Sequence, residues 1–516
     1  MRKAPAATLC GNRGSVASQS SVAVYSPIGR SGRPFAQAHW YGSESYATPT
    51  HMRRTLVVVT ALVAAVAFAS APHAAPVKQY VAPAGSGALF LVGGHGWGHG
   101  VGMGQWGAQG YAQQGYSYDQ ILAAYYPGTM LGQSAVTSIR VLLASGQKKL
   151  VISSKQPITV EDADGIDYAL PAGKTTLTPA LELAVDGGPQ QALTPPLTFS
   201  SDTGSTLSLG RAYRGEIVVD VVNGKLRAIN TLPLEEYLYG VVPAEEPSSW
   251  LPAALQAQAV AARSYAIASR RAGAPFDVYS DTRSQAYGGA SAETPATTQA
   301  VDETTGEVLL YNGHVATTVF SSSTGGRTQS AADAWGSTGK PYLVSVKDPY
   351  DGISPYHNWG PVPVPGKTLG TALGVSGRIV DATVTRNSSR RVKTLKLAAL
   401  LRGTPSTSSV AGATAASALA LRSTWFSVGV LSLQPPVPNR VVAAGTRIRL
   451  SGVVRGVKGV FVQQRTRGKP WTQLRSITPA AKTGAFHFAV RPQVTTDYRL
   501  ATVQDAAAYV RIRVAN

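Results

Sequence analysis

Residues 234–272 read LEEYLYGVVPAEEPSSWLPAALQAQAVAARSYAIASRRA, and this stretch decides how the rest of the chain is interpreted. Its second half predicts a long alanine-rich helix, with Ser249 as a candidate N-cap and Pro252 in the first turn. Its first half is interpreted as an acid-rich turn that holds Glu245 and Glu246 just before the helix. Because the many alanines allow close packing, we expect this helix at the centre of its domain.

Two carboxyl groups beside a helix start have two interpretations. In most proteins they complement the positive end of the helix dipole. Alternatively, one of them is a general acid/base whose pKa is raised by burial in a cleft. The dipole would lower that pKa, so a catalytic glutamate must be desolvated strongly enough to overcome it. Trp250, Tyr237 and Tyr239 are candidates for the apolar walls of such a cleft.

Two further blocks carry candidate site residues. Residues 90–130 begin FLVGGHGWGHGVGMGQWGA, where closely spaced glycines indicate special backbone dihedrals, and helices are expected near 103–114 and 118–126. Residues 320–330, FSSSTGGRTQS, combine hydroxyl side chains and a Gly-Gly pair with an arginine. Such a loop is either a solvated turn or a surface that presents hydroxyls and backbone amides to a sugar.

His95 and His99 invite comparison with a metal site, because they stand four residues apart. The intervening glycines disfavour a regular helix, and no carboxylate or cysteine lies close by in the sequence. We therefore favour a glycine-rich turn with structural or cleft-lining histidines. The single cysteine, Cys10, lies in the N-terminal tail, which leaves the folded part without a thiolate ligand or a disulfide.

Alternating hydrophobicity predicts that much of the remaining chain forms strands. The pattern runs from residue 138 to about 230 and includes a hairpin at Asn223–Gly224, because Asn-Gly fits a type I′ turn. A short helix is expected at 295–303, a second hairpin at 312–313, and further strands from about Arg378. The predicted class is α+β, a mixed β-rich domain around a central alanine-rich helix.

The N-terminal part differs in composition from the middle of the chain. Residues 1–51 are rich in Ser, Gly and Ala and are either a disordered tail or the product of a start codon placed too early, which we favour. Residues 52–75 have the basic, apolar and small-residue regions of a secretory signal peptide. The alternative is an uncleaved signal anchor, although the apolar run is shorter than the ~20 residues of a typical span. The expected location is secreted or in the cell envelope.

The C-terminal part is strongly basic. Prolines mark a linker at 433–439, and residues 440–516 alternate as in a small Ig-like β-sandwich. This last region has fourteen Lys/Arg against two acidic residues, in a chain of net charge +20. Such a surface favours polyanions. Because the export signal argues against nucleic acid, we predict an anionic wall polymer as partner, with a merely solvated basic surface as the alternative.

Three separated segments resemble one protein family. GHGWGHGVGMGQWGA, the stretch from YRGEIVVDVV to AVAARSYA and the stretch YNGHVATTVFSSSTGGRTQSAADAWG are similar to the sporulation stage II protein D (SpoIID)/LytB amidase-enhancer family, over roughly residues 90–430. The resemblance implies a SpoIID-like domain at 76–432. It also implies a lytic transglycosylase acting on peptidoglycan strands without stem peptides and leaving 1,6-anhydro-N-acetylmuramic acid ends, or an enhancer of an N-acetylmuramoyl-L-alanine amidase. No cofactor is implied.

The family pattern places its catalytic glutamate on Glu245, with Glu246 at the position that is usually methionine. The implied partners are peptidoglycan glycan strands and, for the enhancer role, a cell-wall amidase. We assign substrate binding to ten residues of the matching segments, namely Ser321, Ser323, Gly325, Gly326, Arg327, His95, His99, Gln105, Gln285 and Tyr287.

Two departures from the family pattern are visible. Some relatives bind zinc through one His and two Cys in the loop after the helix, where VYSDTRSQAYGG offers neither residue type, so no metal is expected. The GHGWGHG block normally follows the LRSTWF strand, yet here it precedes the whole domain. Such a circular permutation is tolerated when the relevant termini lie close in space. It predicts that residues 90–130 pack beside the strand at Trp425–Phe426 and reach the cleft near Glu245.

Overall fold

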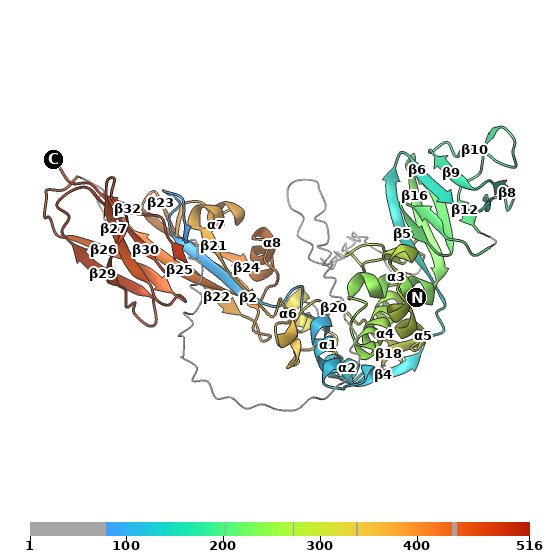
Figure 1. Ribbon diagram of the computed structural model, residues 1–516, viewed down its shortest axis with the longest axis horizontal. Coiled ribbons are helices and arrows are strands. Elements are labelled where there is room, and N and C mark those ends of the chain that lie inside the picture. The colour runs from blue at the N-terminus through green and yellow to red at the C-terminus, as the bar shows by residue number, and fades with distance from the viewer. Residues whose placement is uncertain (1–78, 202, 272, 337–338, 436–440, 516) are drawn as a thin grey trace, which may run out of the picture. The chain divides into compact units, whose positions relative to one another are not determined.

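The computed structural model (Figure 1) describes residues 79–515 except positions 202, 272, 337–338 and 436–440. The expected N-terminal tail, the expected signal peptide and most of the expected linker lie outside the described residues. None of the helices in the described ranges is both long and apolar enough to cross a membrane.

The described chain divides into two compact units. Unit 1 consists of residues 90–430, and unit 2 combines residues 79–89 with residues from 431 onwards. Residues 79–89, which the sequence analysis placed in the domain at 76–432, therefore belong to the C-terminal unit. The cause is strand pairing, because β1 (Tyr80–Val81) runs parallel to β31 (Asp505–Ala506). The mixture of helices and strands confirms the predicted α+β class.

A seven-stranded sheet in unit 1 forms the β-rich layer that the alternating pattern predicted. Its order is β17-β5-β16-β15-β12-β7-β8. Asn223 and Gly224 have φ of 51° and 68°, as the type I′ hairpin requires. The bounds are β5 Ser138–Gln147, β7 Ile158–Glu161, β8 Asp167–Leu170, β12 Leu197–Ser200, β15 Glu216–Val222, β16 Lys225–Pro233 and β17 Val278–Tyr279.

A four-stranded sheet of order β14-β13-β6-β9 and a two-stranded hairpin accompany it. Their bounds are β6 Leu150–Ser154, β9 Gly173–Leu177, β13 Leu207–Leu209, β14 Arg211–Tyr213, β10 Glu182–Ala184 and β11 Gln190–Ala192.

Helix α3 (Leu234–Glu245) replaces the turn that the sequence analysis expected. Leu234, Tyr237, Leu238 and Val241 are buried at the spacing of one helix face, so their packing against the sheet favours a helix. Pro243 lies in the last turn, close to the end of the helix.

Helix α4 (Pro252–Ala268) is the alanine-rich helix predicted at the centre. Its N-cap is Leu251 and not Ser249, because the regular dihedrals begin at Pro252. Leu255, Ala259 and Ala262 pack into the core under the sheet, whereas Ala257 and Val260 pack into a second core. A helix that packs into cores on two sides is apolar nearly all round. The sequence of α4 therefore does not alternate between one apolar face and one polar face.

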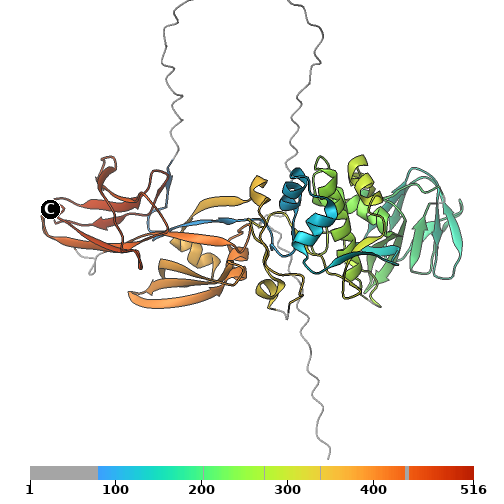
Figure 2. The ribbon, with the colours of Figure 1, turned by 90° about the horizontal axis from the view of Figure 1, so that it is seen from below.

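The second core contains the helices of the GHGWGHG block. Helices α1 and α2 contact α4, and the blue and green helices lie side by side in both views (Figures 1 and 2). The hairpin predicted at Asn312–Gly313 and the predicted short helix α5 are both present. The bounds are β2 Leu89–His95, β3 Met103–Gly104, α1 Gln105–Gln113, α2 Tyr118–Tyr125, β4 Met130–Gln133, η1 Gly289–Ala292, α5 Pro295–Asp302, β18 Glu307–Tyr311 and β19 His314–Val315.

The last part of unit 1 contains the strands expected from residue 378. Strands β22, β23 and β24 form an antiparallel sheet, and β2 of the glycine-rich block lies between β21 and β25. The bounds are β20 Phe320–Ser321, α6 Ala331–Trp335, η2 Asp351–Ile353, β21 Asn358–Pro365, α7 Gly366–Ala372, β22 Arg378–Arg386, β23 Val392–Leu401, β24 Thr404–Ala411, α8 Gly412–Ala418 and β25 Phe426–Gln434.

Unit 2 consists of strands. β26 and β29 pair antiparallel, and a second sheet has the order β1-β31-β30-β27-β28, with β32 also on β30. Phe486, Phe488 and Val490 of β29 are buried at every second position, as in a strand with one face on a core. The bounds are β26 Ile448–Arg455, β27 Phe461–Thr466, β28 Thr472–Ser476, β29 Ala485–Val490, β30 Thr496–Ala501 and β32 Val510–Ile512.

Candidate active site

Glu245 and Glu246 lie at the C-terminal end of a helix, whereas the sequence predicted a turn before a helix start. Glu245 is the last residue of α3 and Glu246 is its C-cap. The C-terminal end of a helix is the negative end of its dipole, where a carboxylate is disfavoured. The dipole of α3 therefore works in the same direction as burial and favours the protonated form, in contrast to the expected opposition between the two effects.

Glu245 is a half-buried residue, and its carboxyl group accepts a short backbone hydrogen bond. The backbone N–H of Ala286 donates to its Oε1 at 2.6 Å. Burial raises the pKa of Glu245 to about 7, and hydrogen bonds from Ala286 and the Gln105 side chain reduce that shift. The Gln105 amide nitrogen also lies 3.3 Å from the Glu245 backbone oxygen. Glu245 is thus an acid with a pKa near neutrality.

Glu246 has a different environment although it is the next residue. Its side chain is 2% exposed, and neither carboxyl oxygen has a hydrogen-bond partner in the described chain. Burial, and secondly the charge of Glu245, raise the pKa of Glu246 well above its ordinary value. A buried carboxyl without partners is stable only when neutral. Glu246 therefore fills space as the methionine of the family pattern would.

The GHGWGHG block contacts the segment that carries the two glutamates. The Trp106 and Trp250 rings are 4.9 Å apart, and the Gln109 side chain accepts a 3.0 Å hydrogen bond from the Leu251 backbone N–H. On the other side of this block, the His95 backbone N–H donates to the Trp425 oxygen at 2.9 Å. The contacts confirm both parts of the permutation hypothesis, the packing beside Trp425 and the approach to Glu245.

The predicted aromatic walls are placed differently from one another. Tyr237 is fully buried, and burial chiefly raises the pKa values of Tyr237 and Tyr265, with a smaller contribution from the charge of Glu245. The Tyr239 hydroxyl donates to Asp302 at 2.6 Å. Tyr239 is therefore engaged by helix α5, whereas Tyr265 is an additional ring near Glu245 that the sequence analysis missed.

Gln285 and Tyr287 are core residues and not surface contacts for a substrate. Gln285 is 1% exposed, accepts from the Tyr237 hydroxyl at 3.1 Å and donates to the Ala262 oxygen at 3.3 Å. Tyr287 is 3% exposed and donates to Asn230 at 2.8 Å. Since the two side chains flank Ala286, they fix the backbone N–H that binds Glu245. Their role is positioning, which corrects the assignment to substrate binding.

The serine-glycine loop is built around a buried aspartate that the sequence analysis missed. Asp351 is fully buried and accepts from the Ser323 hydroxyl at 2.8 Å and the Gly325 backbone N–H at 3.0 Å. The Thr324 N–H and the His357 ring Nδ1 also bind it, at 2.9 and 2.7 Å. Ser323 and the Gly325 amide are therefore used inside the protein. The only sequence signal was an aspartate in the turn-forming run DPYDG.

The other assigned residues of this loop differ in accessibility. Ser321 is 7% exposed and accepts from the Gly100 backbone N–H at 3.1 Å. Gly326 and Arg327 are half-buried, and the Arg327 guanidinium lies 3.5 Å from Ser345. Gly326 and Arg327 are thus the members of the assigned loop that remain partly accessible.

The two histidines have separate surroundings. The His95 ring lies 5.0 Å from the Trp425 ring, whereas the His99 ring lies 5.6 Å from that of Trp335. Burial and the nearby Arg391 lower the pKa of His99 to about 4, so its imidazole is neutral. A cavity of about 1180 Å³ opens beside His99, and Glu245 is not among its lining residues. Within the described ranges, no group of three or more His, Cys, Asp or Glu side chains is arranged to hold a metal.

Replacement of Gly100 by alanine should lower the stability of unit 1 by about 3 kcal/mol, measured by chemical denaturation. Gly100 has φ of 68°, and an added Cβ would overlap the guanidinium of Arg391, which is fully buried and cannot move aside. Gly115→Ala is the control, because Gly115 has φ of 84° but open space around it, and should cost about 1 kcal/mol. Equal losses would show that the Arg391 contact is unimportant.

Comparison with known proteins gives the family of the central segment. The family model described as stage II sporulation protein, SpoIID, matches residues 222–311. Residues 222–311 are thus similar to the SpoIID family. This SpoIID segment contains helices α3 and α4 and therefore Glu245. The match confirms the resemblance stated from the sequence. The comparison with solved structures found no significant match.

Several curated proteins are similar to this chain over part of their length. An amidase enhancer of Bacillus subtilis is 44% identical over 114 residues, which are 22% of this chain and 15% of that protein. Stage II sporulation protein D of Bacillus subtilis is 37% identical over 146 residues, 25% of this chain and 42% of that protein. An uncharacterized protein of Brachyspira hyodysenteriae is 39% identical over 153 residues, 29% of this chain and 41% of that protein. The chain spans less than half the length of each relative.

Proposed function

We propose that this protein acts on the bacterial cell wall as a lytic transglycosylase, which cleaves the bond between N-acetylmuramic acid and N-acetylglucosamine in glycan strands. The observation that carries the proposal is the Glu245 carboxyl group. It is half-buried, has a pKa of about 7 and lies in the SpoIID segment. An acid of that pKa can donate a proton at neutral pH and accept one afterwards.

In the proposed reaction Glu245 acts twice. Its protonated form donates to the glycosidic oxygen while the bond from that oxygen to the muramyl C1 breaks. The carboxylate then accepts the proton of the muramyl C6 hydroxyl while the C6 oxygen bonds to C1. The product has a 1,6-anhydro end, Glu245 is protonated again, and no water is consumed.

A single carboxyl group distinguishes this reaction from ordinary glycoside hydrolysis. Hydrolases use two carboxyl groups on opposite faces of the sugar. Glu246 is 2% exposed and cannot reach a polymer, although it adjoins Glu245 in the chain. The accessibility of Glu245 and the burial of Glu246 therefore favour the one-carboxylate reaction.

Cleavage should lose activity as the pH rises through the pKa of Glu245. The first step needs the protonated form, so kcat/KM should be level below about pH 6 and fall about tenfold per pH unit above about pH 8. The pKa of Glu245 is higher in the folded protein, at about 7, than its ordinary value of 4.5 in the unfolded chain. The contribution of Glu245 to folding stability should therefore decrease as the pH rises from 4.5 to about 7. Thermal unfolding at each pH separates the two effects. A profile that rises with pH would contradict the protonated role.

The second candidate function is enhancement of a cell-wall amidase without cleavage. It is favoured by the 44% identity to an amidase enhancer. In that role the same surface holds the glycan strand and Glu245 has no proton to transfer. Addition of the protein to a purified cell-wall amidase tests it. Stimulation that survives Glu245→Gln, with no glycan cleavage by either form, would establish the enhancer role and exclude the transglycosylase.

Both functions require that the protein reaches the wall. We propose secretion or retention in the cell envelope, on the basis of the signal-peptide pattern at 52–75. N-terminal sequencing of protein recovered from the culture medium or envelope tests this proposal. A start just after residue 75 is expected for a cleaved signal peptide, and recovery of the protein from the cytosol alone would contradict the proposal.

A further inference from the structure

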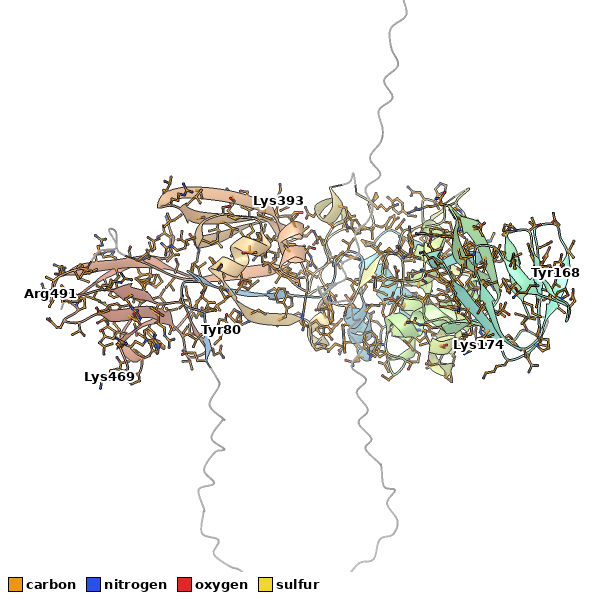
Figure 3. The ribbon with its side chains drawn as sticks, turned by 90° about the horizontal axis from the view of Figure 1, so that it is seen from above. Tyr80, Tyr168, Lys174, Lys393, Lys469 and Arg491 are labelled. Carbon is orange, nitrogen blue, oxygen red and sulfur yellow. The ribbon has the colours of Figure 1, made fainter. Side chains whose placement is uncertain are left out.

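Unit 2 contains a groove whose charges are unbalanced. The groove has a volume of about 1050 Å³ and is lined by β27, β28 and the segment that follows β29. Its lining residues include Arg465, Lys469, Arg475 and Arg491, and no aspartate or glutamate is among the described lining residues. Figure 3 shows Lys469 and Arg491 at the surface of this unit.

Arg465 also belongs to a row of arginine and aromatic side chains on the other face of β27 and β30, because its register partner Asp497 alternates with the groove-lining Thr496 and Tyr498. The Arg465 and Arg499 guanidinium groups lie 4.5 and 4.2 Å from the centre of the Trp471 ring. The row continues through Tyr509, whose ring centre is 5.4 Å from Arg465 and 5.3 Å from Arg511. These contacts fix the arginine side chains in place, so an anion that binds them would cost little side-chain ordering.

The arginines of the row have more positive charge than their carboxylate can balance. Asp497 pairs with both Arg465 and Arg511, at 3.3 and 2.7 Å. Arg499 is 5% exposed and bonds instead to the neutral side-chain oxygens of Gln463 and Gln79. Burial, and secondly the charge of Arg465, lower the pKa of Arg499 to about 10. Two cations on one indole ring repel each other, and a bound anion would relieve that repulsion.

The shape and spacing of this surface favour a polymer over a small anion. Four basic residues line the groove, and the row adds the Arg499 and Arg511 side chains on the other face of the same strands. A chain with repeated negative charges can contact several of these cations at once, which strengthens binding without any single strong contact.

We propose that this groove, together with the arginine–aromatic row on the other face of the same strands, binds a polymer whose sugar or polyol units are joined by phosphodiesters, the chemistry of anionic cell-wall polymers. Arginine suits this ligand because its planar guanidinium binds phosphate oxygens in pairs. All the residues of the proposed anion site lie in unit 2. The choice of a wall polymer over a nucleic acid rests on the proposed function. The two proposals can fail separately, because Glu245 lies in the other unit.

The test uses the full-length protein and measures its affinity for poly(glycerol phosphate), for neutral dextran and for a single-stranded oligonucleotide of similar charge. Wild-type protein should bind poly(glycerol phosphate) most tightly, with an affinity that falls as salt is added. Equal binding to dextran would overturn the anion site, and tighter binding to the oligonucleotide would overturn the choice of a wall polymer. Glu245→Gln should bind as wild type, whatever its cleavage activity.

A matched pair of variants tests the place of binding. Lys469→Gln with Arg491→Gln removes two exposed charges from the groove and should lower the affinity about tenfold. The control, Lys458→Gln with Lys482→Gln, removes the same charge from exposed positions of unit 2 outside the groove. It should change the affinity by less than about twofold. Trp471→Ala should weaken binding at unchanged charge, because Arg465 and Arg499 lose the ring that orders them. Equal losses in the two double variants would overturn the proposal.

Discussion

Glu245→Gln should lower the rate of glycan cleavage by about 10²–10⁴-fold or more, the usual contribution of general acid–base catalysis. The amide has nearly the shape of the carboxyl group, and its oxygen can still accept the hydrogen bond from the Ala286 N–H. It cannot donate a proton to the glycosidic oxygen as an acid or accept one as a base. Initial rates of strand cleavage measure the loss, and the thermal unfolding midpoint should stay close to that of wild type.

Glu246→Gln is the matched control one residue away. Because Glu246 is buried and its carboxyl contacts no polar partner in the described chain, cleavage should stay within about threefold of wild type. Stability at neutral pH should be equal or higher, since the variant removes a buried group that can ionise. If Glu246→Gln were inactive and Glu245→Gln active, the roles of the two glutamates would be exchanged.

Asp351→Ala should destabilise unit 1 by about 3–5 kcal/mol in chemical denaturation. The substitution leaves the Ser323 hydroxyl and the backbone N–H groups of Thr324 and Gly325 without their acceptor. Asp351 itself is fully buried, so water cannot replace its carboxylate without opening the loop. The serine-glycine loop should therefore become the first part of unit 1 to lose protection against hydrogen exchange.

Asp281→Ala is the control for Asp351→Ala, because it shows how much folding stability is lost when a surface aspartate is removed. Asp281 pairs with Arg283 at 2.8 Å, but the two side chains are 52% and 61% exposed. Exposed pairs of this kind contribute little, so the loss should be about 0.5 kcal/mol or less. A loss for Asp351→Ala as small as that for Asp281→Ala would show that the buried network around Asp351 does not hold the loop.

The sequence predicted the elements whose signals are local. The Asn223–Gly224 hairpin follows from turn chemistry, and α4 follows from its alanine content. Helix α3 was missed because its acidic residues and Pro243 suggested a turn. The spacing of Leu234, Tyr237, Leu238 and Val241 contained the correct signal. That error also reversed the dipole argument, because it placed the glutamates before a helix start when they stand at a helix end.

The roles of loop side chains could not be read from local patterns. Ser323 looked available to a sugar, yet its hydroxyl is bound by Asp351, which lies 28 residues further along the chain. Gln285 likewise bonds to Tyr237, 48 residues earlier in the chain. Polar side chains in a loop are exposed or buried according to partners that the fold brings from elsewhere. Glu245 was identified because the family pattern marked it, and its burial could be established only in the structure.

The chain ends of digested glycan strands, identified by mass spectrometry, show whether Glu245 catalyses a lytic transglycosylation. Purified protein is incubated with peptidoglycan strands freed of stem peptides, and the new chain ends are identified. We expect 1,6-anhydro-N-acetylmuramic acid ends with wild type and with Glu246→Gln, and none above background with Glu245→Gln. Reducing ends formed with uptake of water, or intact strands after incubation with active wild-type protein, would contradict this expectation.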